Sequence, residues 1–314
     1  MCKVIFLNNW GEDYESILSR YSLQTPNSSG EWGNIKGVSK INEADYYVIM
    51  DGAPSKLVES LDRSRVIFFQ REPSLVVSPF SDDPLADSRS ALNHDFLSNI
   101  LFDGSYKNFH NVGIWWIDKS FNELEKLPYP PKNKKFSFYG KTGNNLSSVT
   151  SGKTWYPAHT TRIDFLNQFI EEHSSIDVWG RGTGKVLKNT SCYKGEIPTP
   201  KCKFKGLIDY EYSLTLENTF EPNTWTEKPL DAFLCWSIPI YSGASNFGDF
   251  FPSDSFLQID ITSEQKIKKT IPEIIEYISS PVSAKQIEAL REARNDLLFK
   301  WNIWPIIDRI IKEK

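Results

Sequence analysis

The chain has 314 residues, of which 39% are hydrophobic and 24% charged, a balance typical of a globular protein with two domains. Its 36 Lys and Arg residues are outnumbered by 40 Asp and Glu residues, so no positive excess exists to bind a nucleic-acid backbone or an anionic membrane non-specifically. The apolar run Val4–Leu7 is too short for a signal peptide, and no run of about 20 apolar residues could span a membrane. We therefore predict a cytoplasmic protein with no nucleic-acid partner and no membrane span.

The first half of the chain alternates short apolar runs with polar segments of helical character. An acidic loop, Gly11–Asp13, is expected to cap a helix that runs through Leu18. Strands separated by helices are typical of a parallel sheet with crossover helices. The segments that carry this pattern are strands at Val4–Leu7, Ala44–Gly52 and Arg65–Gln70, a helix at Ser55–Leu61 and a further apolar run at Asn111–Ile117.

A proline-rich segment follows this first half. Three prolines within four positions, Pro128, Pro130 and Pro131, cannot continue a helix or a central strand. We therefore predict a linker over Pro128–Lys135, with one domain at residues 1–131 and a second at residues 132–300. Residues 301–314 are expected to form a C-terminal helix, and packing back on the first domain is one alternative for it.

The same alternation of strands and helices restarts after the linker, so the second domain is also expected to be α/β. Strands are predicted at Phe136–Tyr139, Ile176–Trp179, Tyr212–Leu216 and Ile238–Tyr241, and helices at Arg162–Glu172, Glu227–Cys235, Ile271–Ser279 and Ala284–Lys300.

A glycine-rich turn, Gly180–Lys185, follows one of these strands. A dinucleotide-binding fingerprint needs glycine where Lys185 stands, and a phosphate-binding loop needs Ser or Thr where Val186 stands. The turn therefore fits neither motif. Gly180 and Arg181 remain candidates for the edge of a ligand site, and a plain turn is an equal alternative.

Metal-binding patterns are absent from the sequence. The four Cys residues form no CxxC pair, the four His residues do not fall at zinc-finger spacing, and no Asp-x-Asp triplet occurs. We predict a reduced chain without structural zinc and without a dedicated metal site.

The densest cluster of polar residues follows the predicted strand at Tyr212–Leu216. Glu217 and Asn218 come directly after this strand, so they are expected at the carboxyl edge of the sheet, where ligands bind in α/β domains. Thr226 is a candidate helix N-cap, and Lys228 then stands in the first turn, where the helix dipole also favours an anion. Glu227 could accept hydrogen bonds from vicinal hydroxyls. The alternative is that Glu217 and Glu227 only cap and solvate the turn.

This segment resembles the signature of the α1,3/4-fucosyltransferases, glycosyltransferase family 10. The family pattern reads roughly Phe-Glu-Asn-Ser, six further residues and Thr-Glu-Lys. This chain has Leu216–Thr219 and Thr226–Lys228, with the same ten-residue step between the two glutamates. The likeness continues through Ile238–Gly243 and Phe251–Phe256. Upstream, His159–Arg162 resembles the arginine-bearing helix start of the family.

The resemblance implies a GT-B-like α/β fold, with two Rossmann-like domains facing each other across a cleft and a helical C-terminal tail. The first domain would bind a glycan acceptor and the second a GDP-sugar donor. It also implies transfer of L-fucose from GDP-β-L-fucose with inversion. By similarity, Arg162 and Lys228 would hold the diphosphate, Asn218 would contact it, and Glu227 would take the ribose hydroxyls. Glu217 belongs to the same expected donor site, and His159 is a candidate for its edge.

In the first domain, Glu72 resembles the acidic residue that is the proposed general base of the family. The alternative for Glu72 is a surface ion pair with Arg71. No cofactor is expected to be required, because Lys and Arg can neutralise a departing diphosphate. A Mn²⁺ or Mg²⁺ ion on the diphosphate stays an open alternative.

One departure from the family concerns the donor sugar. The family commonly has Tyr-Val-Thr-Glu-Lys, whereas this chain has Thr224 and Trp225 before Thr226. Thr224 and Trp225 are included in the expected donor site, and the donor sugar need not be fucose. A transferase of the same fold with another nucleotide sugar, and a glycan-binding module without catalysis, are the two alternatives. The sequence does not indicate the acceptor glycan.

Overall fold

The computed structural model describes residues 1–8, 11–50, 52–69, 112–140, 158–197, 203–220 and 222–313. The chain divides into two compact units. The first unit contains residues up to 114, then 120–126 and 298–314, and the second contains 115–119 and 127–297.

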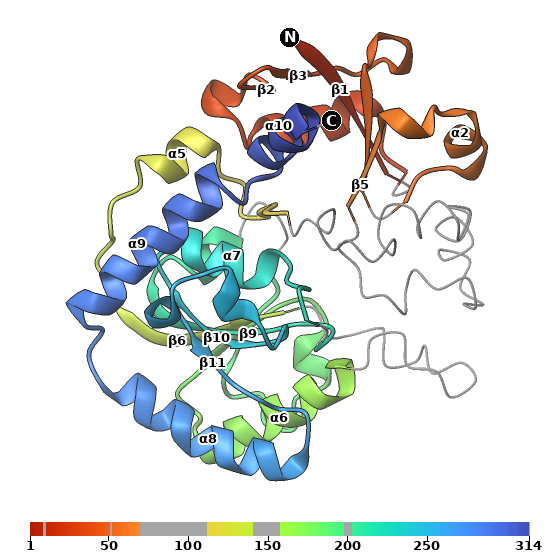
Figure 1. The fold of residues 1–314 in the computed structure, drawn as a ribbon. Helices are drawn as coiled ribbons and strands as arrows, with labels where there is room; N and C mark the ends of the chain where they lie inside the picture. The colour runs from red at the N-terminus through yellow and green to blue at the C-terminus, as the bar shows by residue number, and fades with distance from the viewer. Residues whose placement is uncertain are drawn as a thin grey trace. The chain divides into compact units, whose positions relative to one another are not determined.

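The described residues of the first unit form a five-stranded sheet (Figure 1). Its order is β2-β3-β1-β4-β5, and only the β2–β3 pair is antiparallel. The strands are β1 (Cys2–Leu7), β2 (Glu31–Trp32), β3 (Ile35–Gly37), β4 (Tyr46–Met50) and β5 (Val66–Phe69), and the helices are α1 (Tyr14–Ser22), α2 (Ser55–Ser60), α5 (Phe121–Glu125) and α10 (Ile303–Glu313).

Alternate residues of β1 supply two layers of apolar core. Ile5 and Leu7 belong to one buried cluster, which also contains Val58 from α2. Phe6 lies between them in sequence and instead stacks on Tyr21 of α1, with ring centroids 4.4 Å apart. Trp304 of α10 contacts the same Phe6 ring edge-on at 5.2 Å. The C-terminal helix predicted for residues 301–314 therefore packs within the first unit.

The predicted cap of the first helix is confirmed. Asp13 is the N-cap of α1, and its carboxylate accepts a hydrogen bond from the Ser16 N–H at 2.8 Å. The helix continues four residues beyond Leu18, to Ser22, because Tyr21 supplies a further buried contact.

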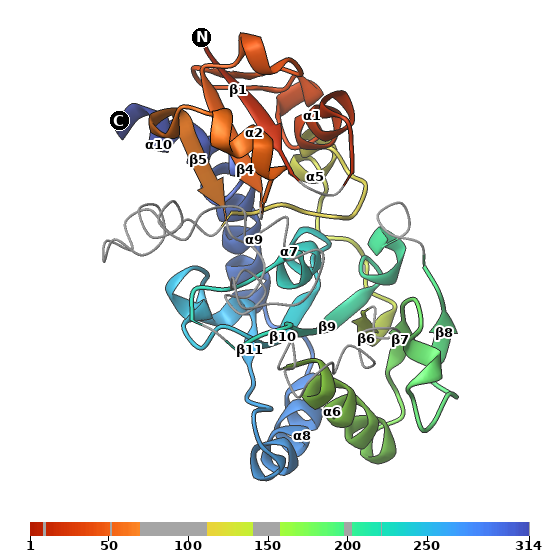
Figure 2. The same ribbon diagram turned by 90° about the vertical axis from the view of Figure 1, so that its right-hand side faces the viewer.

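The second unit is built on a parallel sheet of six strands within the described residues, ordered β11-β10-β9-β6-β7-β8. Helix α7 covers one face of this sheet, and α6 and α8 cover the other (Figures 1 and 2). The strands are β6 (Lys134–Tyr139), β7 (Asp177–Trp179), β8 (Tyr193–Gly195), β9 (Tyr210–Leu216), β10 (Ile238–Ser242) and β11 (Leu257–Gln258), and the helices are α6 (Ala158–Glu172), α7 (Glu227–Leu234), α8 (Glu264–Ser279) and α9 (Ala284–Phe299).

Two helices of the second unit begin several residues before their predicted starts. Helix α6 includes Ala158, four residues before the predicted start, so Arg162 lies in its second turn. Helix α8 begins at Glu264 rather than Ile271 and runs through Pro272. Ser263 caps this earlier start through its hydroxyl, and the buried Ile267 extends the apolar face of the helix by one turn. Packing of that face outweighs the break expected at proline.

Candidate functional site

The site is centred on Glu217, the residue that follows β9. Its backbone N–H donates to the Ser242 carbonyl at 2.8 Å, which continues the pairing of β9 with β10. Its side chain is only 1% exposed. One carboxylate oxygen accepts the Thr226 backbone N–H at 2.7 Å, and the other accepts the Lys228 ammonium at 3.0 Å. Glu217 therefore acts on its surroundings through Thr226 and Lys228, because its own oxygens are buried and occupied.

Close packing around Glu217 also explains a glycine of the motif. A Cβ atom at Gly243 would lie 2.6 Å from Cγ of Glu217 and 2.3 Å from the Tyr241 hydroxyl. Real Cβ atoms do not approach this closely, so the turn after β10 leaves no room for a side chain. Gly243 thus lets β10 run beside the buried carboxylate.

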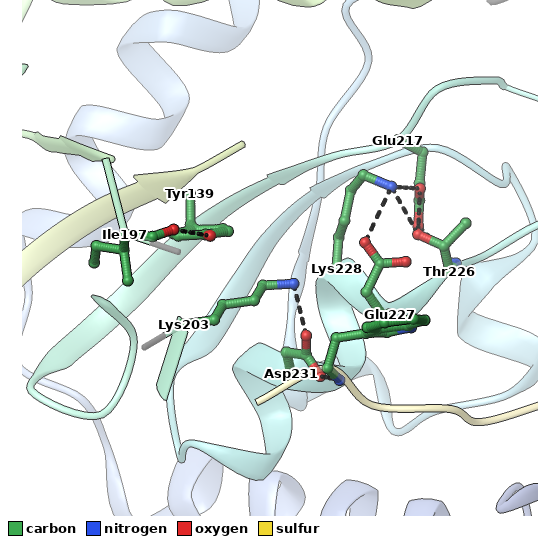
Figure 3. Close-up of polar contacts among 9 residues, drawn as sticks. Tyr139, Ile197, Lys203, Glu217, Thr226, Glu227, Lys228 and Asp231 are labelled. Carbon is green, nitrogen blue, oxygen red and sulfur yellow. Dashed lines mark hydrogen bonds and ion pairs between the residues drawn. The ribbon is translucent and has the colours of Figure 1, made fainter. Parts of the chain in front are cut away.

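The start of α7 carries the polar residues predicted for the donor. Thr226 is the N-cap, as expected, but its hydroxyl makes no capping bond to the helix. The hydroxyl instead donates to Glu217 and accepts from Lys228 at 2.8 Å (Figure 3). Glu217 accepts the backbone N–H of Thr226 itself, the residue that precedes the helix. The Lys228 ammonium also lies 3.7 Å from the Glu227 carboxylate, and 17% of the Lys228 side chain reaches solvent.

A second helix begins beside the same strand end. The Ala158 N–H of α6 donates to the backbone carbonyl of Asn218 at 3.3 Å. Arg162, one turn further along α6, donates to the side-chain oxygen of Asn218 at 2.6 Å and is 5% exposed. The structure thus brings Arg162, Asn218, Glu217, Glu227 and Lys228 to one edge of one sheet. Two helix N-termini and two cations at this edge favour an anionic ligand.

Thr224 and Trp225 lie against the neighbouring core. Trp225 is 3% exposed, and its ring contacts Phe250 and Phe251 edge-on at 5.8 and 5.6 Å between centroids. The Thr224 hydroxyl donates to the Pro222 carbonyl at 3.4 Å. Trp225 therefore packs as a core residue beneath the polar turn.

The glycine-rich turn has a clear structural cause at Gly180. Its φ is +130°, and a Cβ atom there would lie 1.9 Å from the Gly140 carbonyl oxygen. Thr183 donates its hydroxyl to that same carbonyl at 2.5 Å. These contacts account for the glycine as part of a tight turn between β7 and β8. Arg181 is exposed on this turn.

Two predicted residues cannot be placed in the site. Glu72 lies outside the described residues. His159 belongs to the first turn of α6, but its side chain is outside the described part of the structure. Their roles remain predictions from the sequence.

A buried ion pair that the sequence did not predict lies beside α7. The Lys203 ammonium lies 2.6 Å from the Asp231 carboxylate, and the two side chains are 5% and 0% exposed. The other Asp231 oxygen accepts the Trp116 backbone N–H at 2.9 Å. Burial raises the pKa of Asp231 to about 6, although Lys203 opposes the shift. Asp231 stands within the recognised segment and could have been noticed, whereas no pattern around Lys203 marks it.

Cations also hold the carboxyl end of α7. Lys132 donates to the carbonyls of Ile208 and Cys235 at 2.6 and 2.9 Å, and Arg294 donates to the carbonyls of Phe233 and Leu234. Burial lowers the pKa of Lys132 to about 8 and that of Arg294 to about 10. Positive charge is favourable at this end of a helix. Helix α7 is thus held by polar contacts at both ends.

The described residues contain neither a metal-binding cluster nor a membrane-spanning helix. No three His, Cys, Asp or Glu side chains gather there in a group that could hold a metal ion. None of the helices described is both long and apolar enough to cross a bilayer.

Comparison with known proteins shows a resemblance to the same family as the motif. Residues 146–278 match the family model "Glycosyltransferase family 10 (fucosyltransferase) C-term". The human 4-galactosyl-N-acetylglucosaminide 3-alpha-L-fucosyltransferase 9 is 30% identical over 124 residues, which are 38% of this chain and 31% of that enzyme. The Helicobacter pylori Alpha-(1,3)-fucosyltransferase FucT is 26% identical over 184 residues, 58% of this chain and 34% of that enzyme. The matches thus span about a third of these relatives.

The fold also resembles that of a solved structure. A glycosyltransferase from Rickettsia africae ESF-5 superposes with a TM-score of 0.51 at 8% identity, over 99% of this chain and 97% of that one. At this identity the likeness concerns the fold alone. The predicted GT-B-like class, with two α/β units and a helical C-terminal region, is confirmed. Residues 146–278, which contain α6, α7 and the whole described site, resemble the C-terminal part of the fucosyltransferases of glycosyltransferase family 10.

Proposed function

We propose that this protein is an inverting glycosyltransferase that moves L-fucose from GDP-β-L-fucose to a hydroxyl of a glycan, as an α1,3-fucosyltransferase. The observation that carries the proposal is the cluster at the end of β9. Within the segment that matches the fucosyltransferase family, Arg162 and Lys228 lie beside the N-termini of α6 and α7. This arrangement suits the diphosphate of a nucleotide sugar.

Each residue of the cluster has a role in this proposal. Lys228 and Arg162 pair with the diphosphate, and Asn218, which already bonds Arg162, contacts it as well. Glu227 accepts hydrogen bonds from the ribose hydroxyls. Glu217 supports this cluster without touching the donor, because its buried carboxylate fixes Lys228 and Thr226. Such preorganised charge needs no rearrangement when the diphosphate takes up negative charge in the transition state.

The reaction is a direct displacement at the anomeric carbon. The Glu72 carboxylate removes the proton from the acceptor hydroxyl, and the oxygen forms a bond to the anomeric carbon. The bond from that carbon to the diphosphate oxygen breaks, and GDP leaves with the electron pair. Attack opposite the leaving group inverts the configuration. A positioned general base contributes about 10²–10⁴-fold in rate.

The donor site is tested by titrating GDP into the protein by calorimetry. Loss of one charged hydrogen-bonding partner costs about 1.5–3 kcal/mol, so Lys228→Ala should weaken GDP binding by about 10- to 100-fold. Because this change leaves Glu217 buried without its cation, the Lys228→Ala/Glu217→Gln variant is measured alongside. The exposed Lys269→Ala serves as the control. GDP affinity that stays at the wild-type value in both Lys228 variants contradicts this role.

The general base is tested with Glu72→Gln, which keeps the shape of the side chain and removes the proton acceptor. Transfer of fucose should slow by two or more orders of magnitude. GDP affinity should stay near that of the wild type, because the nucleotide is assigned to the second unit. Turnover and GDP binding are measured on one preparation. Undiminished turnover would remove Glu72 from the mechanism.

Another nucleotide sugar is the second candidate, and a specific observation favours it. The family commonly places tyrosine where this chain has Thr224, and the aromatic residue that follows, Trp225, is packed in the core. A ring and hydroxyl that would lie near the donor sugar are thus replaced. Donor-hydrolysis rates with GDP-fucose and other GDP sugars separate the two candidates. A parallel titration with UDP tests whether the site prefers guanine to uracil as the nucleobase.

A further inference from the structure

Helix α7 carries two carboxylates on one face. Glu227 and Asp231 are four residues apart, so they lie one helical turn from each other. Like charges at this spacing repel even in water, and Asp231 is fully buried. The first turn of α7, which contains the proposed ribose ligand Glu227, therefore needs positive charge close by.

Two lysines supply this charge from different directions. Figure 3 shows Glu227 turned toward Lys228 and Asp231 turned toward Lys203. Lys203 does not belong to α7 or to the recognised motif. It begins a short 3-10 helix, Lys203–Gly206, that precedes β9.

Lys203 interacts electrostatically with the carboxylates of both Asp231 and Glu227. Burial by itself would lower the pKa of Lys203, but the charges of Asp231 and Glu227 outweigh burial and raise it. The charge of Glu227 likewise adds to the raised pKa of Asp231. The three groups thus form one electrostatic unit, in which Lys203 is the buried cation.

We propose that Lys203 is a positioning residue of the donor site: its ammonium offsets the repulsion between Asp231 and Glu227 and so holds the first turn of α7 in place. Its effect on GDP binding rests on the proposed function, whereas its effect on α7 does not. Lys203 makes no contact with the donor in this proposal. It acts through Asp231 and Glu227.

The test must separate positioning from the simple cost of an unpaired buried charge. Lys203→Met alone leaves Asp231 without its cation and would destabilise the whole unit. In Lys203→Met/Asp231→Asn both charges are removed, and the Asn oxygen can still accept the Trp116 N–H. Removing both partners of a buried pair is often close to neutral for stability. This double variant is therefore expected to fold.

Amide hydrogen exchange of the ligand-free protein is the first measurement. In Lys203→Met, the peptide covering residues 224–234 should exchange about tenfold faster than in the wild type, with a smaller increase in a peptide from α9. In the double variant, where Asp231→Asn has removed the repulsion, both peptides should return toward the wild-type rates. Lys203→Arg keeps the positive charge and should stay closer to the wild type than Lys203→Met. Lys134→Met, which breaks an ion pair with Asp177 at the start of β6, is the matched control and should leave the 224–234 peptide unchanged.

GDP titration is the second measurement. Lys203→Met should bind GDP about tenfold more weakly than the wild type, in proportion to its faster exchange, and the double variant should bind GDP close to the wild-type affinity. Lys203→Met/Glu227→Gln removes the repulsion but leaves Asp231 buried without its cation, so its 224–234 peptide should exchange more slowly than that of Lys203→Met. If the two variants exchange equally fast, Lys203 only compensates the burial of Asp231, and the proposal is wrong. If the wild type binds no GDP, the proposed function fails, and the exchange result still decides the role of Lys203.

Discussion

At the scale of single residues, the candidate site is controlled by side chains that are themselves out of reach of a ligand. Glu217 is buried and fixes Thr226 and Lys228, and Asp231 is buried and fixes Lys203. Buried charges persist in proteins only where partners satisfy them, so each of these residues depends on its partner. The positions of the groups that would contact a donor are thus set by buried residues.

Lys132 yields a prediction about pH at this scale. Its pKa is lowered by burial to about 8 in the folded chain, whereas an unfolded lysine titrates near 10.4. Between these values the unfolded state binds more protons, so stability rises with pH. From pH 7.5 to pH 10, the free energy of unfolding, measured by urea denaturation, should rise by roughly 2 kcal/mol more in the wild type than in Lys132→Met. The exposed Lys269→Met should keep the wild-type pH dependence. An equal pH dependence in the wild type and Lys132→Met would contradict the lowered pKa.

At the scale of elements, helices begin and end where tertiary contacts allow. Helix α7 is fixed at its start by Glu217 and at its end by Lys132 and Arg294, although it has only eight residues. A helix of this length would be marginal by itself in water. Helix α8 keeps Pro272 in its interior because its row of isoleucines, including Ile267 and Ile271, is buried.

Pro272 therefore predicts a stabilising substitution. It lies on the exposed side of α8 and cannot donate a hydrogen bond to the Lys268 carbonyl. Pro272→Ala should raise the free energy of unfolding by about 1–3 kcal/mol, since proline costs about 3 kcal/mol relative to alanine inside a helix. The control is Pro281→Ala in the exposed loop after α8, where loss of a rigid residue should lower stability by up to about 1 kcal/mol. Changes of the same sign in both variants would contradict this explanation.

At the scale of the whole molecule, the chain returns to its first unit at the end. Residues 298–314 belong with the first sheet, and Trp304 donates its indole N–H to the Tyr21 carbonyl at 2.8 Å. Asn302 donates to the Gln24 carbonyl at 2.7 Å. The first unit therefore completes its core only after the second unit has been synthesised.

Trp304→Ala should consequently destabilise the first unit. Truncation of a fully buried tryptophan costs about 3–5 kcal/mol. Amides of β1 should then exchange much faster, while amides of β9 in the second unit keep their wild-type rates. Phe299→Ala, which truncates an aromatic side chain that is 42% exposed, should have less than half the effect. Equal acceleration in β1 and β9 would mean that the units unfold together.

The sequence by itself determined the fold class and the location of the site along the chain. Apolar runs separated by helical segments indicate parallel sheets, because buried parallel strands need near-continuous apolar residues. The polar residues after β9 stand at a strand end, where the geometry of any parallel sheet exposes them. The spacing of Glu217, Glu227 and Lys228 was enough to recognise the family resemblance over residues 146–278.

Only the tertiary structure decided which of these residues is buried and what each one contacts. Glu217 and Glu227 look alike in the sequence, but the first is 1% exposed and packs against the Gly243 turn, whereas the second is 25% exposed. Lys203 carries no local pattern, since its partner Asp231 lies 28 residues away. The start of α8 was likewise set by burial of Ile267. Burial depends on contacts between distant segments, which local periodicity and spacing do not encode.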